Sequence, residues 1–470
     1  MSQIGIAATT YDRDACAVGV VHLGFGAFHR AHQAVYFDDF MQTSGDLRWG
    51  IAAVNLRASE AAQFQIAKDD IAKHDGYFLK AISSDGHVEL RRVRSHVSFQ
   101  DWTTDREDAE GLLAQTSVHL VTITVTESGY YIDPHGDLNI LDDVIATELS
   151  GGEKRSVYGY LHKALQGRMA SSGARLTIAC CDNIRQNGTM LKRNLMAYLV
   201  ACNDNALAEW VDTHVAFPCS MVDRITPRSE PELSEEFSQI TGTAVASPVM
   251  AEDFTQWVLQ ETTKAPTPDL TQSGVTVTAD VDPYEEAKIR VLNGGHTCLT
   301  YLAALEGVVT FDAAMRLPHL HDHFCGFETQ EVLPALTLDL PFSKEKYLES
   351  IGRRFANEAI GDTVARICAD GMAKFPIFVR PTLEGCLRQG IMPHYSIRSI
   401  ASWHQFAQHV AHGKIPFNYV EPSWDELSAM LGNDSFVTSR KLWDDLPETY
   451  PEFADNLRRE IMEMEAVWPV

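Results

Sequence analysis

The sequence predicts an α/β protein, with a parallel sheet flanked by helices over residues 1–282 and a mostly α-helical domain over residues 283–470. Two observations support the first domain: short apolar runs alternate with helical patterns, and the earliest run ends in a Gly-x-Gly turn before a helix. A third supports the second domain, because long helical patterns dominate after residue 282. A chain of 470 residues is too long for one core, so a division into domains is expected.

The predicted strands of the first domain are short runs of mainly apolar residues. The first, Val18–Leu23, ends in the turn Gly24-Phe-Gly26 and is followed by a predicted helix over residues 27–40. This order of strand, glycine turn and helix predicts a Rossmann-like N-terminal domain. The other predicted strands are Trp49–Val54, His119–Val125 and Leu176–Cys180, with Tyr77–Ile82 and His87–Leu90 as a smaller hairpin-like insertion.

The second domain is predicted to follow a loop-like segment over residues 263–274, which contains two prolines and ends in a glycine. Helical patterns then cover Pro283–Leu305, Ser343–Ala356, Ile400–Val410 and Glu452–Val467. The last of these carries an apolar stripe that predicts one buried face. The stripe consists of Phe453, Leu457, Ile461 and Met464.

The charge and composition of the chain exclude some classes of partner. A formal net charge of −25 would repel phosphates, so we expect neither nucleic acid nor an anionic membrane as a partner. The 9 cysteines show no CxxC spacing, and their odd number favours reduced thiols. No segment reaches about 18 consecutive apolar residues, and the N-terminus lacks a secretory pattern, so a cytoplasmic location is expected.

The turn Gly24-Phe-Gly26-Ala-Phe28-His29-Arg30 lies where a dinucleotide-binding fold places its phosphate turn. Glycine lets the backbone approach a pyrophosphate, and the N-terminus of the following helix supplies N–H donors. The third glycine of the usual motif is replaced here by His29. An ordinary strand-to-helix turn is therefore the alternative interpretation.

The end of the second strand should bind the adenosine ribose. Glu60 can bind ribose hydroxyls and favours NAD, whereas Arg57 can pair with a 2′-phosphate and favours NADP. The separation from Gly26 exceeds the usual distance of about 20 residues, and plain surface charges are the alternative for both side chains. NAD is therefore the expected cofactor, with NADP as the alternative.

The segment Lys288–His296 is a candidate catalytic element. Oxidation of a secondary alcohol without a metal needs a base and donors for the developing alkoxide. Lysine can act as that base when burial or a positive neighbour lowers its pKa towards about 7–8. On an α-helix, Lys288, Asn293 and His296 fall within an arc of roughly 140°. The alternative is a solvated lysine followed by an Asn-Gly-Gly-His turn.

Several motifs, in order along nearly the whole chain, resemble those of the polyol-specific long-chain dehydrogenases. This family includes mannitol 2-dehydrogenases and the fructuronate and tagaturonate reductases. The resemblance implies an NAD(P)-dependent enzyme that interconverts a sugar alcohol and its 2-ketose without a metal. The motifs are His22–Gln33, Thr122–Tyr131, Cys181-Asp-Asn183 with Asn187-Gly188, Phe217–Pro227 with Val222-Asp223-Arg224, and Pro283–His296.

The resemblance also implies a role for each matching residue. Lys288 resembles the family's general base, and His296 resembles a substrate-orienting group. Asn293 and Asn183 resemble the amides that stabilise the alkoxide. The residues assigned to the cofactor are Gly24, Gly26, Phe28, Arg30, Glu60 and Val222, and those assigned to the substrate are Asp223, Arg366 and Lys374.

Two other functions are weighed against polyol oxidation. The first is the reduction of a hexuronate. Mannitol dehydrogenases carry an Arg at the Arg366 position, where fructuronate reductases have a Trp-containing variant, but Asn55 is more like the reductases. The region beyond about Ile391 also looks shorter and more divergent, so the substrate stays open. The second is a cofactor-binding sensor without catalysis, against which the intact catalytic segment argues.

The remaining polar clusters have plainer interpretations. His319-Leu-His321-Asp-His323 has alternating histidines that can bind zinc, but no Cys or Glu stands at a recognisable spacing, so no metal site is predicted. Cys180-Cys181 is interpreted as packing. Glu127 is either a proton relay for Lys288 or an ordinary loop carboxylate. The expected partner is a small polyol or sugar-acid substrate, and the chain is expected to be a monomer or a small homo-oligomer.

Overall fold

The structure is a computed structural model that describes residues 5–133, 136–261 and 264–470. The chain divides into two compact units, Met1–Val281 and Asp282–Val470. Within the described ranges, no helix has both the length and the apolar character needed to cross a membrane. Thr263, at the start of the predicted loop, lies outside those ranges. The rest of that loop contains the 3-10 helix η6 (Leu270–Ser273), whose C-cap is Gly274.

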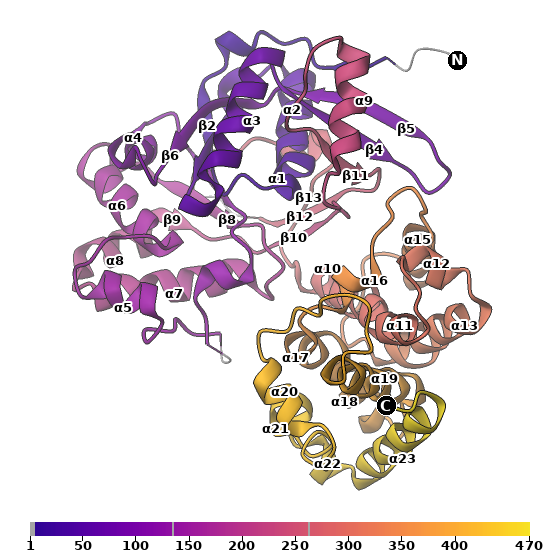
Figure 1. Cartoon of the computed structure of the whole chain (residues 1–470). Helices are drawn as coiled ribbons and strands as arrows, with labels where there is room; N and C mark the ends of the chain where they lie inside the picture. The colour runs from indigo at the N-terminus through magenta and orange to yellow at the C-terminus, as the bar shows by residue number, and fades with distance from the viewer. Residues whose placement is uncertain (1–4, 134–135, 262–263) are drawn as a thin grey trace. The chain divides into compact units, whose positions relative to one another are not determined.

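The N-terminal unit is built on a parallel sheet with the strand order β6-β3-β2-β7-β8-β9 (Figure 1). Its inner strands are buried on both faces, which explains why they appear as nearly continuous apolar runs in the sequence. The predicted parallel sheet and Rossmann-like fold are confirmed. The strands are β2 (Val18–Leu23), β3 (Gly50–Asn55), β6 (His96–Asp101), β7 (Leu120–Ile123), β8 (Leu176–Cys180) and β9 (Val215–Ala216).

Helices connect these strands, and the first connection differs from its prediction. The predicted helix over residues 27–40 is wrong in one respect, because it breaks at His32, where φ is −121° and ψ is −93°. The His32 ring is held from outside the helix, with Nε2 2.9 Å from the carbonyl of Gln256. The helices are α1 (Ala27–Ala31), α2 (Gln33–Ser44), α3 (Ala61–His74), α4 (Arg106–Gly111), α5 (Asp143–Leu149), α6 (Val157–Ala170), α7 (Asn187–Ala201), α8 (Asn205–His214) and α9 (Pro231–Thr241).

Two smaller sheets complete this unit. One has the order β1-β5-β4-β11 and contains the predicted hairpin, since β4 and β5 pair antiparallel with Tyr77 opposite Val93. The other has the order β10-β12-β13. The strands are β1 (Ala7–Ala8), β4 (Tyr77–Ile82), β5 (Val88–Val93), β10 (Ser220–Asp223), β11 (Val249–Glu252), β12 (Gln256–Gln260) and β13 (Thr276–Thr278).

The C-terminal unit is mostly helical, which confirms the prediction for it. The helix predicted from Ile400 begins earlier, at His394. The α-helices are α10 (Asp282–Ala287), α11 (Gly294–Leu305), α12 (Phe311–Met315), α13 (Pro318–Gly326), α14 (Leu333–Ala335), α15 (Lys344–Phe355), α16 (Val364–Cys368), α17 (Gly371–Lys374), α18 (Arg380–Arg388), α19 (His394–Ala411), α20 (Trp424–Met430), α21 (Arg440–Trp443), α22 (Leu446–Thr449) and α23 (Pro451–Val467). Three π-helical segments interrupt these helices in the described part of the chain: η7 (Lys288–Asn293), η8 (Phe327–Val332) and η9 (Phe375–Val379).

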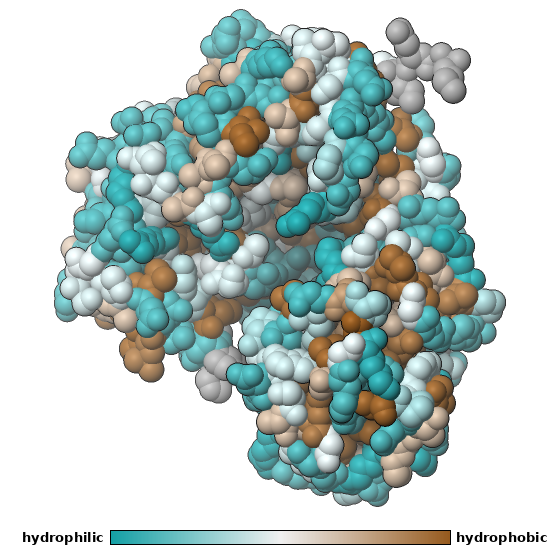
Figure 2. Space-filling model, in the orientation of Figure 1, coloured by the Kyte–Doolittle hydropathy of each residue, from teal (hydrophilic) through white to brown (hydrophobic). Residues whose placement is uncertain are grey.

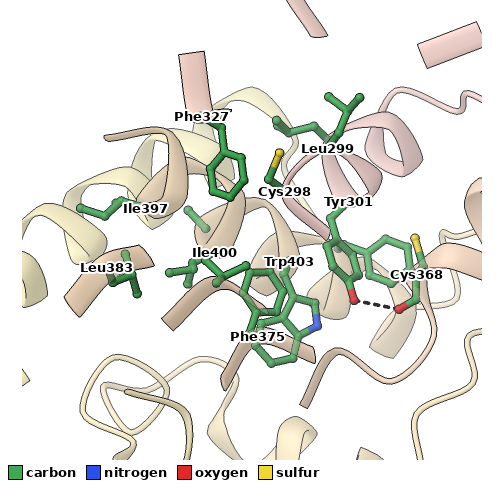
Figure 3. Packing of buried hydrophobic residues seen from close by; sticks show 14 of the residues in the cluster. Cys298, Leu299, Tyr301, Phe327, Cys368, Phe375, Leu383, Ile397, Ile400 and Trp403 are labelled. Carbon is green, nitrogen blue, oxygen red and sulfur yellow. Dashed lines mark hydrogen bonds between the residues drawn. The ribbon is translucent and has the colours of Figure 1, made fainter. Parts of the chain in front are cut away.

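An aromatic core holds the C-terminal unit together (Figure 3). Trp403 of α19 stacks on Phe375, with ring centroids 4.5 Å apart and planes 14° from parallel. Tyr301 of α11 donates a hydrogen bond of 2.8 Å to the carbonyl of Cys368, shown as the dashed line in Figure 3. The core therefore fixes α11 against the end of α16, and both carry candidate site residues.

The surface of each unit is predominantly hydrophilic on the face shown in Figure 2, with hydrophobic residues in small groups. In the last helix, Phe453, Leu457 and Met464 are buried and Ile461 is half-buried, so the predicted apolar stripe faces the core.

Candidate active site

The dinucleotide turn follows β2. Gly24 has a φ of +93°, and a Cβ placed on it would lie 2.0 Å from the carbonyl oxygen of Thr124, so only glycine fits there. Gly26 is different, because a Cβ on it would meet open space. Gly26 is also the N-cap of α1, and no side chain caps that helix end. The turn thus presents uncapped backbone N–H groups beside free space, which is what a pyrophosphate needs.

His29 is packed beneath the turn, where the usual motif has its third glycine. Its ring stacks on His22 with centroids 3.2 Å apart, and its Nε2 lies 2.9 Å from Nε2 of His96. Burial lowers the pKa of His29 to about 3. The stacked rings are therefore neutral, because burial also lowers the pKa of His22 well below its usual value.

Phe28 and Arg30 point in different directions from α1. Phe28 is half-buried and stacks on the ring of His32 at 5.0 Å. Arg30 is buried, and its Nη1 donates to the backbone carbonyl of Ser247 at 2.8 Å and to the Ser247 hydroxyl at 3.0 Å. Arg30 is therefore held by Ser247, two residues before β11, and its side chain does not extend into solvent.

The two residues proposed to bind the adenosine ribose, Arg57 and Glu60, lie next to each other after β3. Glu60 ends a short 3-10 helix (Ala58–Glu60), and its side chain is 52% exposed. Arg57 Nη1 lies 3.6 Å from Glu60 Oε1, and Arg57 Nη2 donates to the carbonyl of Val125 at 2.8 Å. Both side chains are therefore about half exposed and paired with each other, and Arg57 is held further by the Val125 carbonyl.

Asn183 follows β8 and is held in place through its neighbour Asp182. The Asp182 carboxylate accepts hydrogen bonds from the backbone N–H of Val125 at 2.9 Å, from that of Thr126 at 3.2 Å, and from the Tyr130 hydroxyl at 2.6 Å. These bonds join the loop after β8 to the loop after β7. Asp182 was not among the predicted site residues, and a lone Asp in a loop gives no signal of such a role.

The Asp182 carboxyl makes stability depend on pH. Burial raises its pKa from 3.8 to about 6, against the opposing effect of the Tyr130 hydroxyl. The raised value means that Asp182 contributes its stability below about pH 4 and that this contribution is lost as the pH rises through about 6. We expect the free energy of unfolding of the wild type, relative to Asp182→Asn, to fall by roughly 3 kcal/mol over that interval. Urea unfolding at several pH values measures this, and a constant difference would contradict it.

Two further residues position this region, although neither was assigned a role from the sequence. Asn187, at the start of α7, donates to the carbonyls of Asp182 and Ser220 at 3.1 and 2.8 Å and accepts from the Ser220 N–H at 2.9 Å. Arg224 is buried, and it donates to the carbonyls of Glu252 and Ala31. Arg224 thereby ties β10 to the end of α1.

Val222 and Asp223, the other candidates of this unit, lie at the end of β10. Both are buried, and they pair with Trp257 and Gln256 of β12. The N-terminal unit therefore contains all the predicted cofactor residues and two of the predicted substrate and catalytic residues, Asn183 and Asp223.

In the C-terminal unit, Lys288 begins a π-helix instead of lying within an α-helix. The run from Asp282 to Leu305 is helical as predicted, but η7 interrupts it between α10 and α11. The arc of about 140° computed for an α-helix therefore does not apply to this segment. Backbone bonds of a π-helix join residues five apart, which is the spacing of Lys288 and Asn293. The two side chains are thus one π-turn apart, and Lys288 is only 6% exposed.

The predicted alternative of an Asn-Gly-Gly-His turn is wrong, because Gly294 and Gly295 begin α11. A Cβ on Gly295 would lie 2.8 Å from Glu328 Oε1 and 2.9 Å from the ring of Phe324, so the helix passes this point only with glycine. The Asn293 carbonyl accepts a hydrogen bond of 2.8 Å from the Thr297 hydroxyl. Close packing therefore keeps this stretch helical.

His296 lies in an aromatic slot, near two candidate substrate residues. Its ring stacks on Phe355 with centroids 4.0 Å apart and meets Phe311 edge-on at 4.7 Å. Burial lowers the pKa of His296 well below 6.5, and the positive charges of Arg366, Arg354 and Lys374 lower it further. The structure thus brings His296, Arg366 and Lys374 into one electrostatic neighbourhood, in which the imidazole is neutral.

Arg366 and Lys374 are both held by local bonds. Arg366 forms a bidentate ion pair with Asp362, one turn earlier, with Nε 2.6 Å from Oδ1. Lys374 Nζ donates to the carbonyl of Ile367 at 2.8 Å. Burial lowers the pKa of Lys374 from 10.5, with Asp370 opposing the shift. Both groups are cationic donors, which suits the hydroxyls of a polyol.

Gly371 controls the position of Lys374, and its substitution gives a testable prediction. A Cβ on Gly371 would lie 2.5 Å from the indole nitrogen of Trp403 and 2.8 Å from the Tyr301 hydroxyl, both within the core. We expect Gly371→Ala to cost about 1–3 kcal/mol of stability and to raise the KM for substrate, because α17 must shift. Thermal unfolding and steady-state kinetics measure the two effects.

The matched control is Gly352→Ala on α15, where a Cβ meets nothing within 4 Å. Alanine is the better helix former, so this variant should gain up to about 1 kcal/mol and keep the wild-type KM. Equal melting temperatures for the two variants would contradict the packing argument.

The histidine cluster of α13 is divided among separate partners. His319 Nε2 lies 2.9 Å from Glu306, His321 lies beside the Cys325 thiol, and His323 Nε2 lies 2.9 Å from the Ser399 hydroxyl. Among the residues with described positions, no group of three or more His, Cys, Asp or Glu side chains is arranged to hold a metal ion. Glu127 lies in the 3-10 helix η5 (Glu127–Tyr130), and it is exposed.

Both units match models of known protein families. The family model described as the mannitol dehydrogenase Rossmann domain matches residues 18–272, and that described as the mannitol dehydrogenase C-terminal domain matches residues 280–464. The chain is 33% identical over 435 residues to D-arabinitol 4-dehydrogenase of Ralstonia nicotianae. The matched region covers 91% of this chain and 92% of that protein. It is 33% identical over 465 residues to mannitol 2-dehydrogenase of Cereibacter sphaeroides, with 98% and 95% covered.

One solved structure is similar over nearly the whole chain. It is the ternary complex of Pseudomonas fluorescens mannitol 2-dehydrogenase with NAD and D-mannitol. The TM-score is 0.87 at 29% identity, covering 98% of this chain and 94% of that one. Sequence and structure comparisons therefore agree for both units.

Proposed function

This chain belongs to the mannitol dehydrogenase family, and we propose that it is an NAD-dependent enzyme that oxidises a secondary hydroxyl of a linear sugar alcohol to a ketone. The family membership confirms the resemblance seen in the sequence motifs. The observation that carries the proposed chemistry is the element Lys288–His296. In that element a buried lysine, an amide one π-turn away and a neutral imidazole follow one another on a continuous helical run.

The residues of the N-terminal unit fit a dinucleotide. Gly24 and Gly26 would hold the pyrophosphate against the uncapped start of α1, where a Cβ on Gly26 meets open space. The exposed carboxylate of Glu60 would bind the ribose hydroxyls. Arg57, which would otherwise favour a 2′-phosphate, bonds to Glu60 and to the Val125 carbonyl, and this supports NAD over NADP. Phe28, Arg30 and Val222 complete the proposed cofactor set.

The proposed mechanism assigns one task to each residue. Lys288 Nζ takes the proton of the reacting hydroxyl, and Asn293 and Asn183 donate hydrogen bonds to the oxygen as negative charge develops on it. A bound nicotinamide would supply the acceptor for the hydride of the same carbon, so that the alcohol becomes the ketone. His296 is neutral, so it can both donate and accept hydrogen bonds while it orients the substrate. No metal is required for these steps.

Arg366, Lys374 and Asp223 are each proposed to bind hydroxyl groups of the substrate. Cations and a carboxylate can form directional bonds with hydroxyls. The similar proteins are named for mannitol and for D-arabinitol, both linear polyols, so mannitol and arabinitol are the first substrates to test.

The test is absorbance in the reduced-nicotinamide band with NAD and NADP in parallel, over a panel of mannitol, arabinitol, sorbitol and mannonate. The proposal expects turnover with at least one neutral polyol and NAD, and no turnover with mannonate. Turnover with mannonate alone would identify a hexuronate reductase. Binding of NAD without turnover on any member of the panel would identify a cofactor-binding protein that lacks catalysis.

A further inference from the structure

A cavity of about 410 Å³ lies in the N-terminal unit, beside the dinucleotide turn. Four segments surround it: the first turn of α1, the start of α3, the segment that leads from β10 into α9, and residues 246–248 before β11. Its volume falls in the lower part of the range of roughly 300–1,000 Å³ for small-molecule sites. The polar side chains that line it include Arg30, Gln63, Thr226, Arg228, Glu230 and Ser234.

Arg30 is a buried cation whose donors are only partly used. It is 7% exposed, and among the residues that the structure describes it forms no ion pair. Its Nη1 bonds to Ser247, whereas its Nε is buried and has no hydrogen-bond partner there. The Phe25 and Tyr77 rings lie 5.3 and 5.7 Å from the guanidinium, and burial lowers the pKa of Arg30. The nearby carboxylate of Asp70 opposes this shift without forming a direct ion pair, so an anion in the cavity would add to the stabilisation of the buried guanidinium.

The rest of the lining adds positive potential and polar donors. Arg228 is exposed and forms no hydrogen bond or ion pair with any residue in the described ranges. Helix α9 begins at the cavity with Glu230 as its N-cap and no side-chain cap, although its first residue, Pro231, has no N–H and the Leu233 N–H donates to the Glu230 carbonyl. The buried Thr226 hydroxyl has no partner within those ranges. Helix N-termini and free arginines together favour phosphate groups.

We propose that this cavity binds the phosphate group of a phosphate monoester, between Arg30, Arg228 and the N-terminus of α9. Gln63 and Ser234 are then available to the organic part of the ester. The carboxylate of Glu230 lies at the rim and opposes the anion, so it sets a limit on affinity. The ester has two sources: a separate phosphorylated metabolite, or the 2′-phosphate of NADP, which would make NADP the cofactor in place of the NAD of the proposed function.

Calorimetric titration of the full chain with inorganic phosphate, against chloride at equal ionic strength, tests the cavity directly. We expect saturable binding that weakens about tenfold in Arg228→Ala and tightens several-fold in Glu230→Gln. Arg175→Ala is the matched control, because Arg175 is an exposed arginine of the same unit that does not line the cavity. It should bind phosphate as the wild type does.

The two sources are separated by repeating the titration with cofactor. If the site takes the 2′-phosphate, phosphate competes with NADP but not with NAD, and Arg228→Ala weakens NADP alone. If it takes a separate ester, phosphate binds with unchanged affinity to protein saturated with NAD. Absence of phosphate binding above the chloride control, or equal affinity in Arg228→Ala and wild type, overturns the proposal. Because these readouts are binding constants, they stand apart from any failure to turn over a polyol.

Discussion

Replacing Lys288 with alanine is expected to lower kcat for polyol oxidation by about 100- to 10,000-fold, since the group that removes the hydroxyl proton is lost. The affinity for NAD should stay within about twofold, because the predicted cofactor residues all belong to the N-terminal unit and are unchanged. Steady-state absorbance of the reduced nicotinamide measures the first effect. Quenching of protein fluorescence by the cofactor measures the second.

Two further variants make this result decisive. Lys346→Ala removes an exposed lysine from α15 and should keep the wild-type kcat. Lys288→Met keeps the length of the buried side chain, so it should fold like the wild type yet be as inactive as Lys288→Ala. If Lys288→Met turned over normally, another group would have to be the base and the proposed mechanism would be wrong.

The elements of the fold that could be predicted from the sequence are those whose burial produces a local pattern of apolar residues. Strand β8 was predicted with the bounds that it has, Leu176–Cys180, because a strand buried on both faces is a continuous apolar run. The break at His32 could not be predicted in this way. It depends on a bond to the Gln256 carbonyl, which comes from a strand more than two hundred residues later.

In the candidate site, too, some features are visible in the sequence and others depend on contacts between distant residues. The spacing of Lys288 and Asn293 is visible in the sequence, but the π-helix that makes this spacing one full turn is not. Glycines 294 and 295 suggest a turn locally, and only the close approach of Glu328 and Phe324 shows why the helix needs glycine at position 295. Roles that consist of bonds between distant loops, such as those of Asp182, carry no local signal at all.

Arg168 is another residue of this kind, and it supports β7 and β8, the two strands whose following loops Asp182 joins. It is 0% exposed, near the end of α6, and burial lowers its pKa to about 10. Its guanidinium donates five hydrogen bonds of 2.7–3.3 Å to backbone carbonyls, and it has no ion pair within the described parts of the chain. The carbonyls belong to Leu113, Gln115, Val118, Ala174 and Arg175, in the segments that lead into β7 and β8.

We expect Arg168→Met to destabilise the chain by about 3–5 kcal/mol, because methionine fills the space but leaves these carbonyls unsatisfied. The thermal midpoint of the N-terminal unit should fall by roughly 10 °C, measured by circular dichroism. Arg175→Met, which alters an exposed side chain next to β8, should change stability by less than about 0.5 kcal/mol. If the two midpoints agreed, the carbonyls would have found other donors. Since β8 leads into the loop that carries Asn183, Arg168→Met should also lower kcat for polyol oxidation, and Arg175→Met should not.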